Sequence, residues 1–276
     1  MTYREICQQL ENAGIENARW DAECLILHHT AMSRAALLSD TAKDFDAPAL
    51  LDAVKRRCQR EPLQYLLGEW EFYRQTYTVS PDCLIPRSDT EILVEEAIRR
   101  LPRGARFADL CTGSGCIAIS VLAERPDTTA IALEKFPATL EIAKKNAERN
   151  GVLHRFSPIC ADVLCTPPTL PTLDAILSNP PYIETKVIDE LSPEVRREPR
   201  AALDGGVDGL LFYRAILDTY TPLLAPDGFI LFEIGYDQGE ALVSLGKAHG
   251  FSCVEILRDL GGCDRVAYLS HLTERT

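Results

Sequence analysis

Apolar and polar positions follow three different patterns along the chain. In the first part, apolar residues recur at the three- and four-residue spacing of amphipathic helices. A short segment then alternates and is rich in aromatic residues, which is typical of a β-hairpin. In the remainder, short apolar runs alternate with helical stretches, and this order favours a parallel sheet covered by helices on both faces. We therefore predict a helical domain over residues 1–68, a hairpin linker over 69–84 and an α/β domain over 85–276.

Two helix starts carry the spacing of a capping box. In this motif a Ser or Thr is followed three residues later by Glu, and each side chain bonds the backbone of the other residue. Thr2 with Glu5 predicts the start of the first helix, and Ser88 with Glu91 predicts the start of the first helix of the α/β domain.

Successive strands of the predicted sheet end in residues that can bind a ligand. The first strand carries Asp109 and continues into a glycine turn, and the next two strands are followed by Glu134 and Asp162. The turn that follows the first strand consists of Cys111, Thr112, Gly113, Ser114 and Gly115. Glycines in a strand-to-helix turn let a ligand approach the backbone, and the carboxyl ends of parallel strands meet at one edge of the sheet. Glu134 stands where nucleotide-binding sheets place the carboxylate that binds ribose hydroxyls.

The fourth apolar run is followed by Asn179, Pro180, Pro181 and Tyr182. Two prolines end a strand abruptly because neither can donate to the sheet ladder. The alternatives are a stiff turn and a site that holds a planar amino group before a methyl donor. In the second case, the Asn179 side-chain oxygen and the Pro180 carbonyl accept the two hydrogens of the amino group, and Tyr182 offers an aromatic face. The strand after the third crosses to lie beside the first, so this motif and the glycine turn should meet.

Composition limits the choice of function. The chain has 276 residues, 46% of them hydrophobic, and its formal net charge is −12. No stretch is apolar and long enough to span a membrane and no export signal is evident, so we expect a cytoplasmic protein. The acidic charge disfavours a broad surface for nucleic acid. The ten cysteines form no CxxC pair and have no histidine at ligand spacing, so we expect free thiols and no metal.

At this point the chain resembles a known family. The motifs that carry the resemblance are the predicted helical domain, Ile85 to Glu91, the glycine turn, Asn179 to Tyr182, Glu198-Pro199, Leu203 to Gly206 and Glu233 to Gly239. Together they resemble the bacterial release factor glutamine methyltransferases, the HemK or PrmC family. The resemblance implies a class I fold that uses S-adenosylmethionine and N5-methylation of the glutamine in the Gly-Gly-Gln loop of release factors. It also implies that the helical domain helps to dock the release factor.

This resemblance implies specific roles for the candidate residues. The methyl donor is expected at Asp109 to Gly115, with its ribose on Glu134 and its adenine near Asp162 and Val163. Asn179 would contact both donor and substrate, with Pro180, Pro181 and Tyr182 on the substrate side and Asn179, Pro180 and Tyr182 as the catalytic group. Release factors are the expected partner, with no direct contact to nucleic acid or membrane, and we expect a monomer.

One residue departs from the family pattern. Cys111 stands where the family usually has the first glycine of the turn. A positive φ there would strain a side chain by about 1–2 kcal/mol and weaken donor binding, and we expect an ordinary φ because Gly113 and Gly115 remain.

Three alternative functions stay open at this stage. A sibling enzyme would methylate a glutamine of a ribosomal protein. An amino methyltransferase acting on nucleic acid shares the Asn-Pro-Pro-Tyr chemistry, although the acidic chain lacks the basic face that it needs. A binding protein without catalytic activity would keep the fold but transfer no methyl group.

Overall fold

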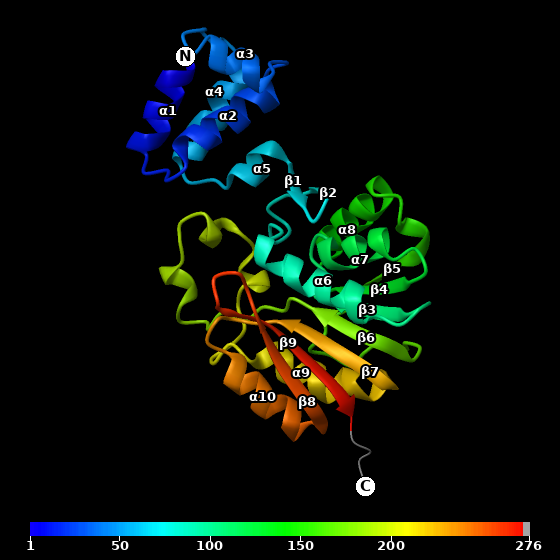
Figure 1. Ribbon diagram of the computed structural model, residues 1–276. Helices are drawn as coiled ribbons and strands as arrows, with labels where there is room; N and C mark the ends of the chain where they lie inside the picture. The colour runs from blue at the N-terminus through cyan, green and yellow to red at the C-terminus, as the bar shows by residue number, and fades with distance from the viewer. Residues whose placement is uncertain (273–276) are drawn as a thin grey trace.

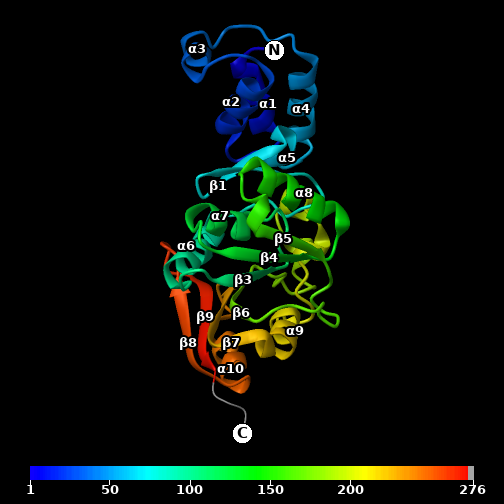
Figure 2. The same cartoon turned by 90° about the vertical axis from the view of Figure 1, so that its right-hand side faces the viewer.

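The chain forms a helical unit joined by a hairpin to a larger α/β unit (Figures 1 and 2). The computed structural model describes residues 1–272. The helical unit contains α1 (Tyr3–Asn12), α2 (Ala18–His29), α3 (Arg34–Ser39), α4 (Pro48–Cys58) and α5 (Leu63–Leu67). Its core is formed by fully buried aliphatic side chains that come from α1, α2, α3 and α4, among them Ile6, Leu10, Leu25, Leu37 and Leu50. The unit therefore has a hydrophobic core of its own.

A hairpin of β1 (Glu69–Phe72) and β2 (Gln75–Thr78) follows the helices. Its two turn residues, Tyr73 and Arg74, have φ of 46° and 75°. Positive φ at both positions gives the turn the twist that matches the flanking strands. The Tyr77 hydroxyl lies 2.7 Å from Ser120 Oγ of the α/β unit, so the hairpin is attached to that unit.

The α/β unit is built on a seven-stranded sheet with the order β5-β4-β3-β6-β7-β9-β8. The first five of these strands are parallel, and β9 runs antiparallel to both of its neighbours. The bounds of the strands are β3 (Arg106–Leu110), β4 (Thr129–Glu134), β5 (Phe156–Cys160), β6 (Leu173–Ser178), β7 (Leu224–Glu233), β8 (Phe251–Arg258) and β9 (Asp264–Leu272).

Helices cover both faces of this sheet. Their bounds are α6 (Glu91–Arg100), α7 (Cys116–Glu124), α8 (Pro137–Arg149), α9 (Leu211–Tyr220) and α10 (Gly239–Ala248). Phe107 of β3 belongs to the core that contains side chains of α6, α7 and α8, whereas its neighbour Ala108 belongs to the core that contains side chains of α9 and α10. Figure 1 shows these two groups of helices on opposite faces of the sheet. Successive strand residues point to opposite faces, so each helical layer has its own buried core. The predicted doubly wound fold is confirmed.

The two capping predictions have different outcomes. The capping box of Thr2 and Glu5 is confirmed by both of its hydrogen bonds. The capping box of Ser88 and Glu91 is wrong, because residues Ser88–Thr90 form a 3-10 turn, η1, before α6 begins. The Glu91 carboxylate instead accepts a hydrogen bond of 3.0 Å from the Tyr73 backbone N–H in the hairpin. A tertiary contact therefore replaces the local cap.

Candidate active site

Asp109, at the end of β3, shapes the glycine turn from behind. Its carboxylate is fully buried and accepts hydrogen bonds from the Thr112 hydroxyl at 2.5 Å and the Ala118 backbone N–H at 3.2 Å. Burial raises the pKa of this carboxyl to about 7. Asp109 is not among the residues that line the neighbouring cavity. Within the structure its contacts are those of a residue that supports the turn.

Cys111 has a φ of 61°, so the expectation of an ordinary backbone conformation at this position is wrong. The chain leaves β3 here and turns back, and the next residue, Thr112, donates its backbone N–H to the Leu133 carbonyl of β4 at 3.0 Å. This bond and the bonds of Asp109 fix the path of the turn whichever side chain stands at position 111. The left-handed conformation costs a side-chain-bearing residue about 1–2 kcal/mol.

The two glycines of the turn do different things. Gly113, with a φ of 56°, has nothing within 4 Å of its missing side chain and lines the cavity. Gly115, with a φ of 82°, does not line the cavity, and a Cβ there would lie 2.7 Å from the Ile119 side chain and 3.3 Å from that of Ala143. Gly113 thus opens the turn to a ligand, whereas Gly115 allows α7 and α8 to pack closely.

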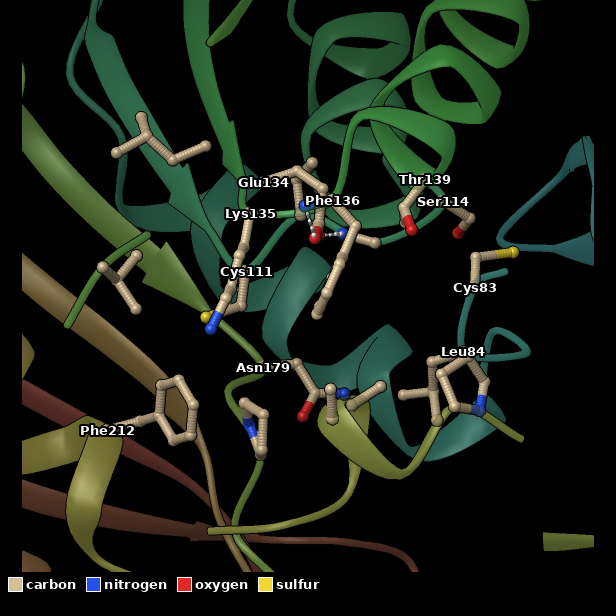
Figure 3. Close-up of a pocket in the computed structure, with 18 of the residues that line it drawn as sticks. Cys83, Leu84, Cys111, Ser114, Glu134, Lys135, Phe136, Thr139, Asn179 and Phe212 are labelled. Atoms are coloured by element: carbon tan, nitrogen blue, oxygen red, sulfur yellow. Dashed lines mark hydrogen bonds between the residues drawn. The ribbon is translucent and has the colours of Figure 1, made fainter. Parts of the chain in front are cut away.

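The cavity in front of the turn has a volume of about 390 Å³ and lies at the carboxyl ends of β3, β4 and β6 (Figure 3). This volume falls within the range of small-molecule sites. Eight of the ten residues predicted to bind the cofactor line it: Cys111, Thr112, Gly113, Ser114, Glu134, Asp162, Val163 and Asn179. The other two are Asp109 and Gly115, described above. The turn and the motif after β6 therefore do meet at the switch point of the sheet.

Glu134 has the geometry of a receptor for hydroxyl groups. Its carboxylate accepts the backbone N–H of Gly113 at 3.1 Å and that of Phe136 at 3.0 Å, drawn as dashed lines in Figure 3. These two bonds fix the carboxylate, and each oxygen keeps a second lone pair for a ligand. Burial raises the pKa of this carboxyl. Phe136, at the same cavity, remains 42% exposed and offers an aromatic surface.

Asn179 and Pro181 also line this cavity, whereas Pro180 and Tyr182 do not. Tyr182 instead lines an adjoining cavity of about 470 Å³ between the hairpin and the loop before α6. Its hydroxyl donates to the Glu233 carboxylate at 3.4 Å. The predicted acceptor motif therefore stands between two cavities, with Asn179 facing one and Tyr182 the other.

The turn that carries Asn179 is held by two distant segments. A Cβ on Gly205 would lie 2.7 Å from the Tyr182 Cα, so the segment after Leu203 packs directly on the motif. The Gln238 side-chain amide donates to the carbonyls of Tyr182 and Gly209 at 3.1 and 3.2 Å. One structural role of two of the sequence motifs, Leu203 to Gly206 and Glu233 to Gly239, is thus to hold the turn that carries Asn179.

Sequence reasoning gave no role to four residues around this turn. They are Thr90, Glu198, Glu233 and Gln238. Glu198 is buried and accepts the Ile85 backbone N–H at 3.0 Å as well as a hydrogen bond from Arg87. All four lie within the motifs named above, and each has at least one hydrogen-bond partner more than fifty residues away in sequence. Only the fold brings them together.

Comparisons with known proteins agree with this architecture. Residues 2–68 match the family model of the PrmC N-terminal domain, and residues 88–206 match that of the methyltransferase small domain. A release factor glutamine methyltransferase of Geobacter sulfurreducens is 40% identical over 261 residues, which cover 93% of this chain and 91% of that protein. One from Salmonella typhimurium is 37% identical over 266 residues and covers 95% of each chain.

Two solved structures are also similar. The hMettl16 catalytic domain, solved with an RNA hairpin, is 18% identical with a TM-score of 0.57 over 81% of this chain and 83% of that chain, which is a likeness of fold alone. The release factor-specific protein-(glutamine-N5) methyltransferase of Alicyclobacillus acidocaldarius is 32% identical, with a TM-score of 0.42 over 71% of this chain and all of that chain.

The doubly wound sheet, the cavity at its switch point and the match to the methyltransferase small domain together identify a class I methyltransferase. Identities of 37–40% over more than 90% of the chain also show which family of methyltransferases this is. The chain belongs to the release factor glutamine methyltransferase family.

Two further findings concern residues 1–272. No helix there is long and apolar enough to cross a membrane. The same residues contain no group of His, Cys, Asp and Glu side chains arranged to hold a metal ion, and all ten cysteines, which lie within them, are free thiols.

Proposed function

We propose that this protein transfers a methyl group from S-adenosylmethionine to the side-chain nitrogen of the glutamine in the Gly-Gly-Gln loop of peptide chain release factors. The observation that carries this proposal is the position of Asn179, which faces the cavity beside the glycine turn and stands in one short turn with Tyr182, which faces the adjoining cavity. A donor in the first cavity and an amide reaching it through the second would meet at this turn. Similarity to named release factor enzymes over most of the chain favours glutamine as the acceptor.

The residues of the first cavity suit the donor. Ser114 Oγ is buried without a hydrogen-bond partner among the described residues, and Gly113 has open space beside its Cα, so the turn can accept a polar group. Glu134 would hold the ribose hydroxyls, and Asp162 with Val163 would hold the adenine. When bound, S-adenosylmethionine supplies a methyl group on a positively charged sulfur, which is an electrophile.

The acceptor amide needs positioning more than activation. Its nitrogen is a poor nucleophile because the lone pair is delocalised, so the nitrogen must be aligned with the methyl carbon and shielded from water. The Asn179 side-chain oxygen and the Pro180 carbonyl would accept its two hydrogens. The nitrogen then forms its bond to the methyl carbon as the bond between that carbon and the donor sulfur breaks, which leaves the electron pair on the sulfur of S-adenosylhomocysteine. The nitrogen loses one proton to solvent after the transfer. Tyr182 would contribute an aromatic face from the second cavity.

The remaining assignments extend this proposal to the whole chain. We assign release factor docking to residues 1–68, a linking role to 69–84 and catalysis to 85–276. The family model matched at residues 2–68 supports a separate amino-terminal unit. We further propose that the protein works as a monomer in the cytoplasm, where translation takes place, without direct contact to nucleic acid.

Mass spectrometry can test the function directly. The purified protein is incubated with the methyl donor and with a release factor, a ribosomal protein or an RNA, each in a separate reaction. We expect a gain of one methyl group on the loop glutamine of the release factor only. Asn179→Ala should still bind the donor and lose at least 100-fold in kcat, about 2.7 kcal/mol of barrier. Methylation of the ribosomal protein or the RNA instead, or of no substrate, would reject the proposal.

A further inference from the structure

A series of hydrogen bonds runs from Asn179 through Thr90, which lines the same cavity, to Glu233, which lines the second cavity. The Asn179 side-chain amide Nδ2 donates to the Thr90 hydroxyl at 3.3 Å, and Thr90 Oγ1 lies 2.5 Å from Glu233 Oε2. Thr90 and Glu233 are each 1% exposed. They come from η1 and from the end of β7, respectively, so three segments that are distant in sequence meet here.

The number of protons available to these three side chains determines which group donates in each hydrogen bond. An ionised carboxylate can only accept, so the single proton of the Thr90 hydroxyl points to Glu233. The Thr90 oxygen can then only accept from its other neighbour. Asn179 must therefore present its NH2 group to Thr90, and its side-chain oxygen is left facing the cavity.

Several charged and titratable groups surround Glu233. Arg265 of β9, Asp89 of η1 and the Tyr182 hydroxyl act on its carboxylate, and Arg87 lines the same cavity as Glu233. The Arg265 guanidinium is itself bound to Asp89 at 3.2 Å and to Asp259 at 3.0 Å. Arg265 is therefore the cation near the Glu233 carboxylate, but its charge is also balanced by Asp89 and Asp259.

Building on the function proposed above, we propose that Thr90 and Glu233 are positioning residues that hold the Asn179 amide with its oxygen toward the hydrogens of the substrate nitrogen. The oxygen and the NH2 group of an amide are nearly equal in size. Without Thr90 and Glu233 the Asn179 side chain can therefore turn so that its NH2 group faces the substrate. Two N–H groups that face each other repel, so the substrate amide is pushed away. The bound substrate then sits with its nitrogen out of line with the methyl carbon.

This arrangement predicts that the rate depends on pH. Burial raises the pKa of the Glu233 carboxyl to about 7, against the opposing effects of the Thr90 hydrogen bond and Arg265. Above this pH the carboxylate is ionised and Thr90 donates to it. As the pH falls through about 7 the carboxyl gains a proton and can itself donate to Thr90, which frees the Thr90 proton to point at Asn179 and reverses the amide. The rate should therefore fall on the acid side.

The first test compares two substitutions of one residue. Thr90→Val keeps the shape of the side chain but removes the hydroxyl, whereas Thr90→Ser keeps the hydroxyl. We expect kcat for methylation of a release factor to fall at least 10-fold in Thr90→Val and to stay within about threefold of wild type in Thr90→Ser. The affinity for the methyl donor, measured by calorimetry, should change less than threefold in both, and this also shows that each variant is folded. Equal kcat values for the two variants would overturn the proposal.

The second test uses the pH profile of kcat. Wild type and Thr90→Ser should lose rate as the pH is lowered through about 7, and Glu233→Gln, which does not ionise, should lose this acid limb. An unchanged acid limb in Glu233→Gln would show that another group controls it and would also overturn the proposal. Failure of the proposed function gives a different result, since wild type itself would then transfer no methyl group to the release factor.

Discussion

Cys111 lines the cavity beside the glycine turn and adopts a left-handed backbone conformation, with a φ of 61°. Glycine adopts this region without strain, whereas any side chain costs about 1–2 kcal/mol. We therefore expect Cys111→Gly to be more stable than Cys111→Ala by about 1 kcal/mol, measured as the free energy of unfolding in urea. Both variants lose the thiol, so their difference isolates the backbone.

Cys160 provides a matched control for this comparison. It is exposed on β5 and is not among the residues with positive φ. There the order should reverse, with the Ala variant more stable than the Gly variant by about 0.5–1 kcal/mol. If Cys111→Ala equals or exceeds Cys111→Gly in stability, position 111 is not strained.

At the residue scale, the sequence predicted side chains whose partners are local and missed those whose partners are distant. Glu134 could be found because its distance from Asp109 along the chain follows from the length of one strand–helix–strand unit. Thr90 could not, because its hydroxyl acts between Asn179 and Glu233, and neither is near it in sequence. The φ of Cys111 was also missed, since it depends on bonds made by its neighbours.

At the scale of elements, the turn after β6 is fixed by segments that contribute no group to the chemistry. Ile183 forms a bridge with Asp204, and the Gly205 N–H donates to the Ile183 carbonyl at 2.8 Å. Gly205 then passes so close to Tyr182 that no side chain fits between them. The sequence indicated these glycines as part of a motif, but their role depends on contacts between strands and loops that no pattern specifies.

This packing predicts the effect of adding one methyl group. Gly205→Ala would place a Cβ 2.7 Å from the Tyr182 Cα and 2.9 Å from the Pro181 carbonyl oxygen, both of them backbone atoms that cannot rotate away. The turn must shift, and we expect kcat to fall at least 10-fold because alignment of the acceptor is lost. Donor affinity should change less than threefold, since Glu134 and the glycine turn belong to other elements.

Val207 provides the control for this substitution. Its side chain is 89% exposed in the same loop, so Val207→Ala should leave kcat within about twofold of wild type. Steady-state kinetics with a release factor and calorimetry with the donor measure both quantities. A Gly205→Ala enzyme with normal kcat would show that the turn tolerates displacement.

At the scale of the whole molecule, one carboxylate joins the helical unit to the loop beyond the active-site turn. Glu194 accepts hydrogen bonds of 3.0 Å from Arg57, in the last turn of α4, and 2.9 Å from Arg60, which follows that helix. Arg57 is buried and also pairs with Asp21 at 2.6 Å. The same loop carries Glu198, which binds the segment before α6. The helical unit and the acceptor turn are thus linked through residues 183–208.

The order of helices and strands along the chain was predictable, but the ion pairs that join the helical unit to the loop at Glu194 were not. Helical spacing and alternation are local properties, so the helices, hairpin and alternating strands could be read along the chain. The pairing of Arg57 with Glu194 spans 137 residues and depends on how the helical unit rests against the loop. No pattern of apolar residues determines that orientation.

Substitution of Glu194 separates a docking role for the helical unit from a merely structural one. Glu194→Ala removes a partly buried charged partner of Arg57 and Arg60, and we expect the free energy of unfolding to fall by about 1–3 kcal/mol. If residues 1–68 dock the release factor, an intact release factor must contact both units at once, and a loosened link lowers the effective concentration of the second contact. KM for intact release factor should then rise at least fivefold, while KM for a short Gly-Gly-Gln peptide stays within about twofold.

Glu124→Ala, which removes an exposed ion pair with Arg74, is the control. It should change the free energy of unfolding by less than about 1 kcal/mol and should leave KM for both substrates unchanged. Equal changes of KM for both substrates in Glu194→Ala would contradict docking by the helical unit.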